Sequence, residues 1–258
     1  YERRLWPWMK RLFDGIAAVL TGSTNVVARI LNSVPAPVLI VLIAALSWVL
    51  RRSTGLVVFV VLSLLFIMNQ GYWDATLETL TLVLVAAMVA TVIGVPLGIW
   101  GAKRPRVYAA MRPVLDLMQT LPTFVYLTPT LVLFGLGIVP GLISTIIFAL
   151  PAPIRLTELG IASVPKTLRE AGQAFGATPL QLLFKVELPS ARPMILAGIT
   201  QCIMLSLSMV VIAALVGAGG LGVPVVRALN TVQVGMGFEA GLAIVLLAIM
   251  LDRISRPA

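Results

Sequence analysis

The 258-residue sequence contains no histidine and a single cysteine, Cys202. The lack of histidine excludes a serine–histidine triad, a histidine-ligated haem and an HExxH zinc site. One cysteine cannot form an internal disulfide or a cysteine-rich metal site. Because Cys202 lies in the apolar run ITQCIMLSL, we expect a buried structural thiol rather than a reactive thiolate, which needs polar surroundings.

Charged residues are also scarce, at 11% of the chain, whereas hydrophobic residues make up 59% and the mean hydropathy is +1.04. Soluble domains are about 25% charged and about 45–50% apolar. These values exclude a water-soluble globular protein and a disordered chain. They indicate an all-α polytopic membrane protein, because lipid-exposed backbone must satisfy its hydrogen bonds within each segment.

Nucleotide-binding motifs are missing or misplaced. No GxxxxGK[ST] P-loop occurs, so this chain is not expected to hold ATP or another cofactor itself, and no metal site is expected. The run GAGGLG satisfies GxGxxG, but it follows an apolar helix rather than a strand, and Pro224 comes two residues later. We therefore interpret it as a glycine-rich turn at which helices approach closely or bend. Its glycines are Gly217, Gly219, Gly220 and Gly222.

Carboxylates are expected only in loops or near the ends of predicted helices. Eight of the ten fall at such positions: Asp74, Glu78, Asp116, Glu158, Glu170, Glu187, Glu239 and Asp252. Proton-coupled transporters commonly hold ionisable groups near the midplane of the membrane. The pattern therefore argues against proton coupling, although it leaves backbone sodium sites open.

Seven apolar stretches predict about seven transmembrane helices, since a span needs roughly 17–25 helical residues. They are Pro35–Leu50, Thr54–Asn69, Leu77–Trp100, Leu121–Gly137, Val139–Leu156, Met194–Val216 and Val234–Leu251. The first two are short and could instead form one tight helical hairpin that turns at Arg51 and Arg52. The fourth and fifth are interrupted by proline.

Helix breaks cluster in the fourth and fifth stretches and at the glycine-rich turn. The residues concerned are Pro122, Pro129, Gly135, Gly137, Pro151 and Pro153. Broken helices often line a transport pathway. Purely structural kinks are the alternative explanation, and the sequence does not decide between them.

The chain has a net charge of +9, and its lysines and arginines are distributed unevenly between the two sides of the membrane in this predicted topology. Thirteen of the nineteen cations fall on one side, from Arg51 to Arg256, whereas the opposite loops hold only Arg227. By the positive-inside rule the crowded side is cytoplasmic, which places the C-terminus inside and the N-terminus outside. The basic charge therefore predicts contact with lipid headgroups, and not with nucleic acid.

The remaining five cations lie in residues 1–34: Arg3, Arg4, Lys10, Arg11 and Arg29. An apolar stripe accompanies them at helical spacing, namely Leu5, Met9, Leu12, Ile16 and Val19, with Trp6 and Trp8 beside it. This pattern predicts an amphipathic helix lying in the headgroup plane. A disordered tail is the alternative. No compact apolar stretch ending in small residues occurs here, so no cleavable signal peptide is expected.

The longest cytoplasmic loop, residues 157–192, has local signals of its own. Thr178 can cap a helix that begins at Pro179, and Gly176 stands where the preceding helix needs a left-handed stop. Pro189 is expected to end the second helix. The first helix, 166–175, carries Leu168, Ala171 and Phe175 on one face. An amphipathic loop lying against the headgroups remains possible.

The run REAGQAFGATPLQLLFKVELP resembles the cytoplasmic "EAA" loop of membrane subunits of ABC importers. The matching positions are Glu170, Ala171, Gly176, Val186, Leu188 and Pro189, and Gly172 replaces the second alanine of the motif. We call residues 157–192 the EAA-like loop. The resemblance implies that its first helix is a coupling helix that docks in a groove of an ATPase through Leu168, Ala171 and Phe175. Glu170 would then pair with a cation on the ATPase or form a hydrogen bond within the loop.

The chain after Leu77 resembles more specifically the permeases of glycine betaine and proline betaine importers. That resemblance implies a type I ABC importer fold with three parts: an N-terminal segment at the membrane surface (1–34), two peripheral helices (35–70) and a core domain (71–258). It also implies a bacterial inner-membrane permease that is not itself an enzyme, works as a homodimer and associates with two ABC ATPase subunits. A periplasmic substrate-binding protein would deliver the betaine, and ATP and magnesium would bind to the ATPase. A secondary transporter and a stretch-activated channel are the alternatives.

Overall fold

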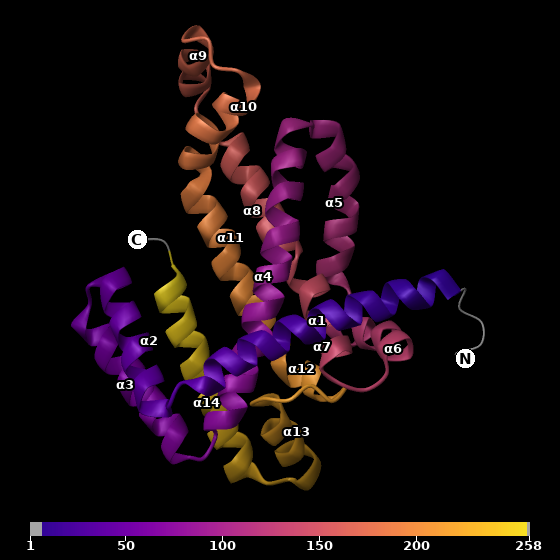
Figure 1. The fold of residues 1–258 in the computed structure, drawn as a ribbon, viewed down its shortest axis with the longest axis vertical. Coiled ribbons are helices and arrows are strands. Elements are labelled where there is room, and N and C mark those ends of the chain that lie inside the picture. Colours follow the sequence, from indigo (N-terminus) through magenta and orange to yellow (C-terminus); the bar gives the residue numbers. More distant parts are fainter. Residues whose placement is uncertain (1–6, 257–258) are drawn as a thin grey trace.

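The computed structural model describes residues 7–256, and the side chains of residues 11–256. Every regular element in that part of the chain is a helix, as the composition predicts (Figure 1). The elements are α1 (Pro7–Ser33), α2 (Ala36–Arg51), α3 (Thr54–Asn69), α4 (Trp73–Lys103), α5 (Pro105–Thr120), α6 (Thr123–Phe134), α7 (Ile138–Ala149), α8 (Pro151–Ala162), α9 (Lys166–Ala174), α10 (Pro179–Leu182), the π-helix η1 (Leu183–Glu187), α11 (Leu188–Ser208), α12 (Val210–Ala214), α13 (Gly222–Thr231) and α14 (Val234–Ser255).

Four helical runs among the described residues are long and apolar enough to cross a membrane. They are α4, the α7–α8 run Ile138–Ala162, the α10–α11 run Pro179–Ser208, and α14. Two further pairs, α1 with α2 and α5 with α6, pass the same test together but are bent by 102° and 96°. The helix α3 is apolar but has only 16 residues. The seven expected spans are therefore not seven straight helices.

The largest departure from the expected helices concerns residues 105–137. The stretch Leu121–Gly137 was expected to span the membrane, but α6 is a helix of only 12 residues. A separate helix, α5, fills what the hydropathy pattern indicated to be a loop. Leu121 is extended (φ −67°, ψ 136°), because a residue followed by proline avoids the helical region, and the chain turns there.

The helix α5 also contains a carboxylate that was expected in a loop or near the end of a predicted helix. Asp116 lies within α5 and accepts a hydrogen bond of 2.5 Å from Arg155 of α8. The expectation failed because the charges of α5 concealed its helical character. The ion pair shows that a cation from another helix matches the charge of this acid.

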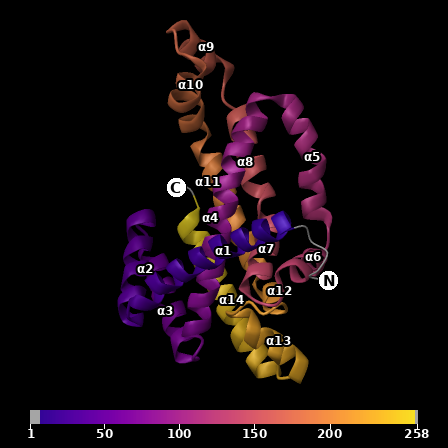
Figure 2. The ribbon, with the colours of Figure 1, turned by 45° about the vertical axis from the view of Figure 1, so that its right-hand side comes forward.

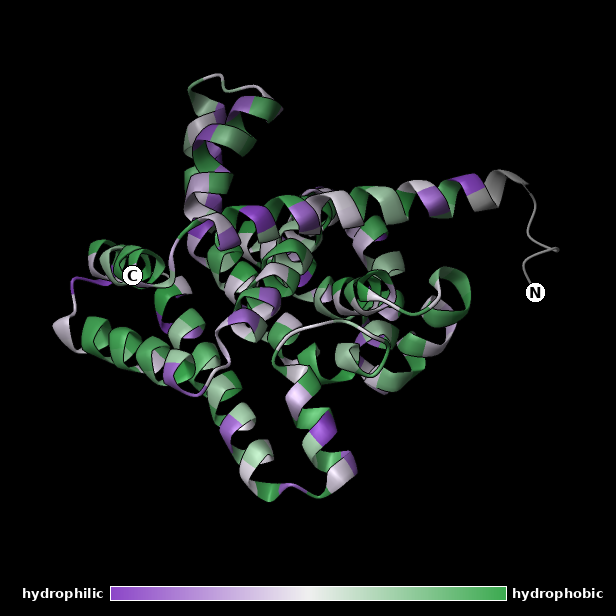
Figure 3. Ribbon diagram, turned by 60° about the horizontal axis from the view of Figure 1, so that its bottom comes forward, coloured by the Kyte–Doolittle hydropathy of each residue, from purple (hydrophilic) through white to green (hydrophobic). Residues whose placement is uncertain are grey.

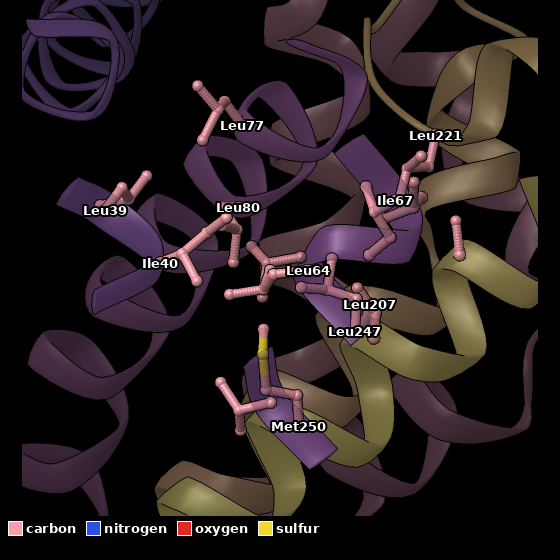
Figure 4. Packing of buried hydrophobic residues seen from close by; sticks show 14 residues of the cluster. Leu39, Ile40, Leu64, Ile67, Leu77, Leu80, Leu207, Leu221, Leu247 and Met250 are labelled. Atoms are coloured by element: carbon pink, nitrogen blue, oxygen red, sulfur yellow. The ribbon is translucent and has the colours of Figure 1, made fainter. Parts of the chain in front are cut away.

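The two short N-terminal stretches form the alternative that the sequence left open, a helical hairpin. Helix α2 ends in the left-handed residue Arg52 (φ 47°), and Ser53 caps α3 by accepting from the Leu56 N–H. The paired helices pack beside α14 (Figures 1 and 2). A cluster of buried side chains joins α2, α3, α4, α11 and α14 (Figure 4).

The N-terminal segment is helical from Pro7, which rules out a disordered tail for the described part. Helix α1 crosses in front of α4 and packs against α4 and α7 (Figure 1). Leu20 is buried against the protein, whereas Leu12 and Val19 of the predicted stripe are 54% and 71% exposed. Figure 3 shows hydrophilic residues interspersed along this helix. Location at the membrane surface stays a prediction, and the positions up to Lys10 lie outside the described side chains.

A second buried cluster joins α1, α4, α7 and α11 around Cys202, which is fully buried. This placement confirms that the single cysteine is buried.

Candidate functional site

The EAA-like loop forms the tip of the molecule at the upper end in Figure 1, where α9 and α10 extend beyond the neighbouring helices (Figures 1 and 2). No residue of α9 is buried. Leu168 is 46% exposed, Phe175 is 92% exposed, and Ala171 is also exposed on this helix. A helix whose apolar side chains meet solvent rather than the rest of the chain is typical of a docking surface for a partner.

The turn after α9 has the geometry that its sequence predicts. Gly176 has φ +77°, in the left-handed region, and its N–H bonds to the Gln173 carbonyl at 2.9 Å. Thr178 and Gln181 then form a capping box: the Gln181 N–H donates to Thr178 Oγ1, and the Thr178 N–H donates to Gln181 Oε1. The residues of this break therefore fix the angle between α9 and α10.

Gly172 provides close packing between the two arms of the loop. A Cβ atom at this position would lie 2.8 Å from Leu182 Cδ1 and 3.4 Å from Val186 Cγ2. The glycine in place of the motif's alanine therefore lets α9 pack closely on α10 and η1, and an alanine would require the Leu182 side chain to shift. Glu170, next to this face, is exposed and has no hydrogen-bond or ion-pair partner among the described residues.

Pro189 does not end the second helix, contrary to expectation. Leu188 and Pro189 begin α11, and α10, η1 and α11 form one continuous run, Pro179–Ser208. The reason is the π-helical turn: the Leu188 N–H donates to the Leu183 carbonyl, five residues back. This wider turn accommodates a residue that lacks an N–H and would crowd the preceding carbonyls of a regular helix.

An ion cluster at the base of the loop was not predicted from the sequence. Glu187 is only 3% exposed and pairs with Lys103 at the end of α4 and with Arg169 of α9, whose Nε lies 3.2 Å from Glu187 Oε1. The Arg169 guanidinium also donates to the Ile161 carbonyl in α8. One buried carboxylate thus connects α9 to α4, and its partner cation connects α9 to α8. The run FKVELP contains an indication of this cluster, because its acid lies among apolar residues. An acid that is buried in such surroundings requires cationic or hydrogen-bonding partners.

A second set of predicted residues meets at the opposite end of the molecule. The turn after α6 and the turn after α12 touch: the Gly137 N–H donates to the Val216 carbonyl at 2.8 Å, and a Cβ on Gly217 would lie 3.2 Å from Gly137 N. Thr79 of α4 accepts from the Leu221 N–H at 2.8 Å. We call this contact the glycine junction; it comprises Gly135, Gly137, Gly217, Gly219, Gly220 and Gly222. This geometry agrees with the predicted glycine-rich turn at which helices approach closely. Among residues 7–256 no strand precedes the run GAGGLG, as a dinucleotide-binding motif would require.

Among the predicted helix breaks, the prolines behave differently from one another. Pro122 precedes α6 and coincides with the sharp bend after α5. Pro129 lies inside α6 without ending it, and Pro151 occupies the first position of α8, where a missing N–H costs little. The expectation of a break is therefore wrong at Pro129, whereas at Pro151 the helix is interrupted between α7 and α8, although the two together form the run Ile138–Ala162. A role in lining a pathway stays a prediction for all these positions.

Comparison with known proteins gives concordant matches. Residues 94–256 match the family described as "Binding-protein-dependent transport system inner membrane component". The glycine betaine transport system permease protein OpuAB of Bacillus subtilis is 49% identical, over 95% of this chain and 86% of its own length. The glycine betaine/proline betaine permease ProW of Escherichia coli is 47% identical, over 95% of this chain and 69% of its own.

Solved structures agree on the fold. A chain of the MetNI methionine ABC transporter, in an inward-facing conformation, superposes with a TM-score of 0.61 at 24% identity. The match covers 73% of this chain and 92% of the MetNI chain. The all-helical architecture is therefore that of an ABC importer permease.

Proposed function

The chain belongs to the family of binding-protein-dependent transport system inner membrane components, and on that premise we propose that it is the permease subunit of an ATP-driven importer of glycine betaine and proline betaine. The observation that carries the substrate class is the identity of 47–49% with two permeases named for these compounds, over 95% of the chain. Quaternary ammonium groups are typically recognised by aromatic cages. By family resemblance, the high-affinity cage belongs to a separate binding protein.

In this proposal two copies of the chain form the translocation pathway, and each copy binds one ATPase subunit through its EAA-like loop. The contacts would be Leu168, Ala171 and Phe175, with Glu170 facing a cation of the ATPase. The exposure of these side chains supports the assignment, as does the absence of an internal partner for Glu170 among the described residues. ATP and magnesium bind to the ATPase, so the permease is not catalytic by itself.

The ion cluster around Glu187 supports a mechanical role for the loop. A displacement of α9 by the ATPase would be transmitted to α4 through Lys103 and to α8 through Arg169. Both helices belong to runs that are long enough to cross the membrane. The loop would therefore move membrane-spanning helices together rather than bend on its own.

The proposed setting is the bacterial inner membrane, with the EAA-like loop and the C-terminus in the cytoplasm and the N-terminus outside. The distribution of cations supports this orientation. Cysteines introduced near Lys103 and Lys166 should react with an impermeant thiol reagent only from the cytoplasm, and one near Trp73 only from outside. Labelling of positions 103 and 166 from opposite sides would contradict the orientation.

Reconstitution in liposomes tests the function itself. The chain with its ATPase and binding protein should accumulate betaine when ATP is present, whereas the chain alone should neither hydrolyse ATP nor accumulate betaine. Accumulation by the chain alone in a sodium or proton gradient would favour the secondary transporter. Rapid conductance under membrane tension in pure lipid would favour the channel.

A further inference from the structure

Three arginines surround a cavity of about 530 Å³ between the α2–α3 hairpin and the C-terminal end of α14. Arg51 comes from the end of α2, and Arg253 and Arg256 come from the last turn of α14 and the residue after it. The volume falls within the range of about 300–1,000 Å³ that is typical of ligand pockets. We call this cavity the arginine pocket.

Backbone contacts hold the walls of the arginine pocket together. The Arg51 Nε donates to the Arg253 carbonyl at 2.8 Å, and another nitrogen of its guanidinium donates to the Arg256 carbonyl. These carbonyls belong to the end of a helix, where they lack partners within the helix. The arginines therefore face one cavity because of a built contact between the hairpin and α14.

The charge of the arginine pocket is strongly positive. Arg256 pairs with Asp252, at 2.9 Å between Nη2 and Oδ2. No carboxylate of residues 7–256 lies within ion-pair distance of Arg253, which is exposed. Because Asp252 already pairs with Arg256, an anion bound in the pocket would chiefly compensate the charge of Arg253.

The floor of the same cavity is apolar, formed by Leu56, Phe59 and Ile249. At the same turn of the hairpin, Trp48 and Arg52 border a second cavity, and Trp48 is 47% exposed. Exposed tryptophan and arginine at the ends of apolar helices mark the depth of the membrane–water interface. A ligand that fits has an anionic phosphate near the arginines and hydrocarbon against the floor.

We infer that the arginine pocket binds the headgroup of an anionic phospholipid, with its phosphate at Arg253 and Arg256 and an acyl chain along Phe59 and Ile249. Basic pockets between membrane helices are established binding sites for anionic headgroups in general. A lipid bound there joins the hairpin to α14 and so to the core domain. Assignment to the inner leaflet rests on the orientation proposed above, whereas the site itself does not depend on the transport substrate.

The test uses the permease–ATPase complex in phosphatidylcholine nanodiscs that contain a small amount of photoreactive phosphatidylglycerol. Crosslinks are expected in residues 51–59 and 249–256. Photoreactive phosphatidylcholine with the same acyl chains should label these segments weakly, and excess inorganic phosphate should not abolish the phosphatidylglycerol signal. Equal labelling by both lipids would overturn the inference, and loss of the signal with phosphate would reassign the pocket to a soluble anion.

Substitutions of Arg253 test whether labelling by phosphatidylglycerol requires the positive charge of this residue. Arg253→Gln should lower phosphatidylglycerol labelling by about tenfold, the loss expected when one charge-assisted hydrogen bond is removed, and Arg253→Lys should retain most of it. The matched control is Arg106→Gln, because Arg106 is also exposed and belongs to the same group of cations. Equal losses in Arg253→Gln and Arg106→Gln would show diffuse attraction to the surface and would contradict a site. If Arg253→Gln does not insert, the mapping of crosslinks in the unmodified complex still decides the question.

Discussion

The two ends of the core domain are held together by different means. At the end that carries the EAA-like loop, side-chain charges join the helices: Glu187 binds Lys103 and Arg169, and the helix α9 beyond them has no buried residue. At the glycine junction, the turns after α6 and α12 meet through their backbones, and a Cβ on Gly217, Gly219, Gly220 or Gly222 would lie 3.2 Å or less from a neighbouring atom. The first end is suited to transmit a displacement imposed by a partner, whereas the second is suited to resist one.

This comparison predicts that substitutions in the EAA-like loop impair coupling while the permease stays folded, and that substitutions in the glycine junction impair folding first. The largest effect on transport is expected from Gly176→Asp. A side chain in the left-handed region costs about 1–2 kcal/mol, and a charge without a partner in an interface adds to that. Betaine uptake should fall by more than about tenfold, and less ATPase should co-purify, while insertion and dimer formation are unchanged.

The control for this variant is Gly176→Asn, which has nearly the same size, no charge and a better tolerance of the left-handed region. Nothing within the chain lies within 4 Å of a Cβ at position 176, so neither variant clashes internally. Normal uptake by Gly176→Asp with ATPase bound would show that the loop is not the coupling element.

The next effect concerns stability at the opposite end. Gly220 has φ +104°, and a Cβ there would lie 2.6 Å from Thr79 Oγ1 and 3.2 Å from Thr79 N. Backbone strain of about 1–3 kcal/mol, added to this clash, should lower the melting temperature of Gly220→Ala by about 5 °C or more. Gly241→Ala is the control, because Gly241 in α14 has no neighbour within 4 Å of its Cβ. Equal melting temperatures for the two variants would contradict the proposed rigidity of the glycine junction.

A smaller effect is expected from Glu187→Gln, which keeps the shape of the side chain and leaves Lys103 and Arg169 without a compensating charge. Both cations are about one third exposed, so water screens part of the loss, and we expect a cost of about 1–2 kcal/mol. ATP hydrolysis by the complex should persist while betaine transported per ATP falls severalfold. Asp116→Asn is the control, because it removes the charge of an exposed ion pair; an equal decrease in both variants would argue against transmission through Glu187.

The smallest effect is expected from Glu170→Ala, since an exposed ion pair typically contributes about 1 kcal/mol or less. ATPase association, measured by titration of the ATPase onto the permease in nanodiscs, should weaken by up to about fivefold. Glu170→Gln should weaken it similarly if the charge matters. An unchanged affinity in both variants would remove Glu170 from the proposed interface.

The sequence predicts those features that depend on a few adjacent residues. The left-handed Gly176 and the cap at Thr178 follow from local backbone preferences, and the structure confirms them. The hairpin turn at Arg51 and Arg52 was one of two alternatives that the sequence left open. The long apolar helices α4 and α14 also appear at the expected places, within a few residues.

Features that depend on contacts far apart in the chain were not predicted. The ion cluster joins Lys103 to Glu187, 84 residues later, and no spacing in the sequence reveals such a pair. Helix α5 was missed because Arg106, Arg112 and Asp116 interrupt its apolar residues. The continuation of the helix through Pro189 was missed because it requires a π turn, which no residue preference announces.

The position of α1 has a consequence for how the protein is assembled during synthesis. This helix leaves the ribosome before the helices that it contacts, yet it packs against α4 and α7, and the ring of Phe13 meets that of Phe134 at a centroid separation of 5.5 Å. Its partners are completed more than one hundred residues later. Helix α1 must therefore wait outside its final position until the following helices have been inserted, so its docking is a late event that closes the fold over helices already in place.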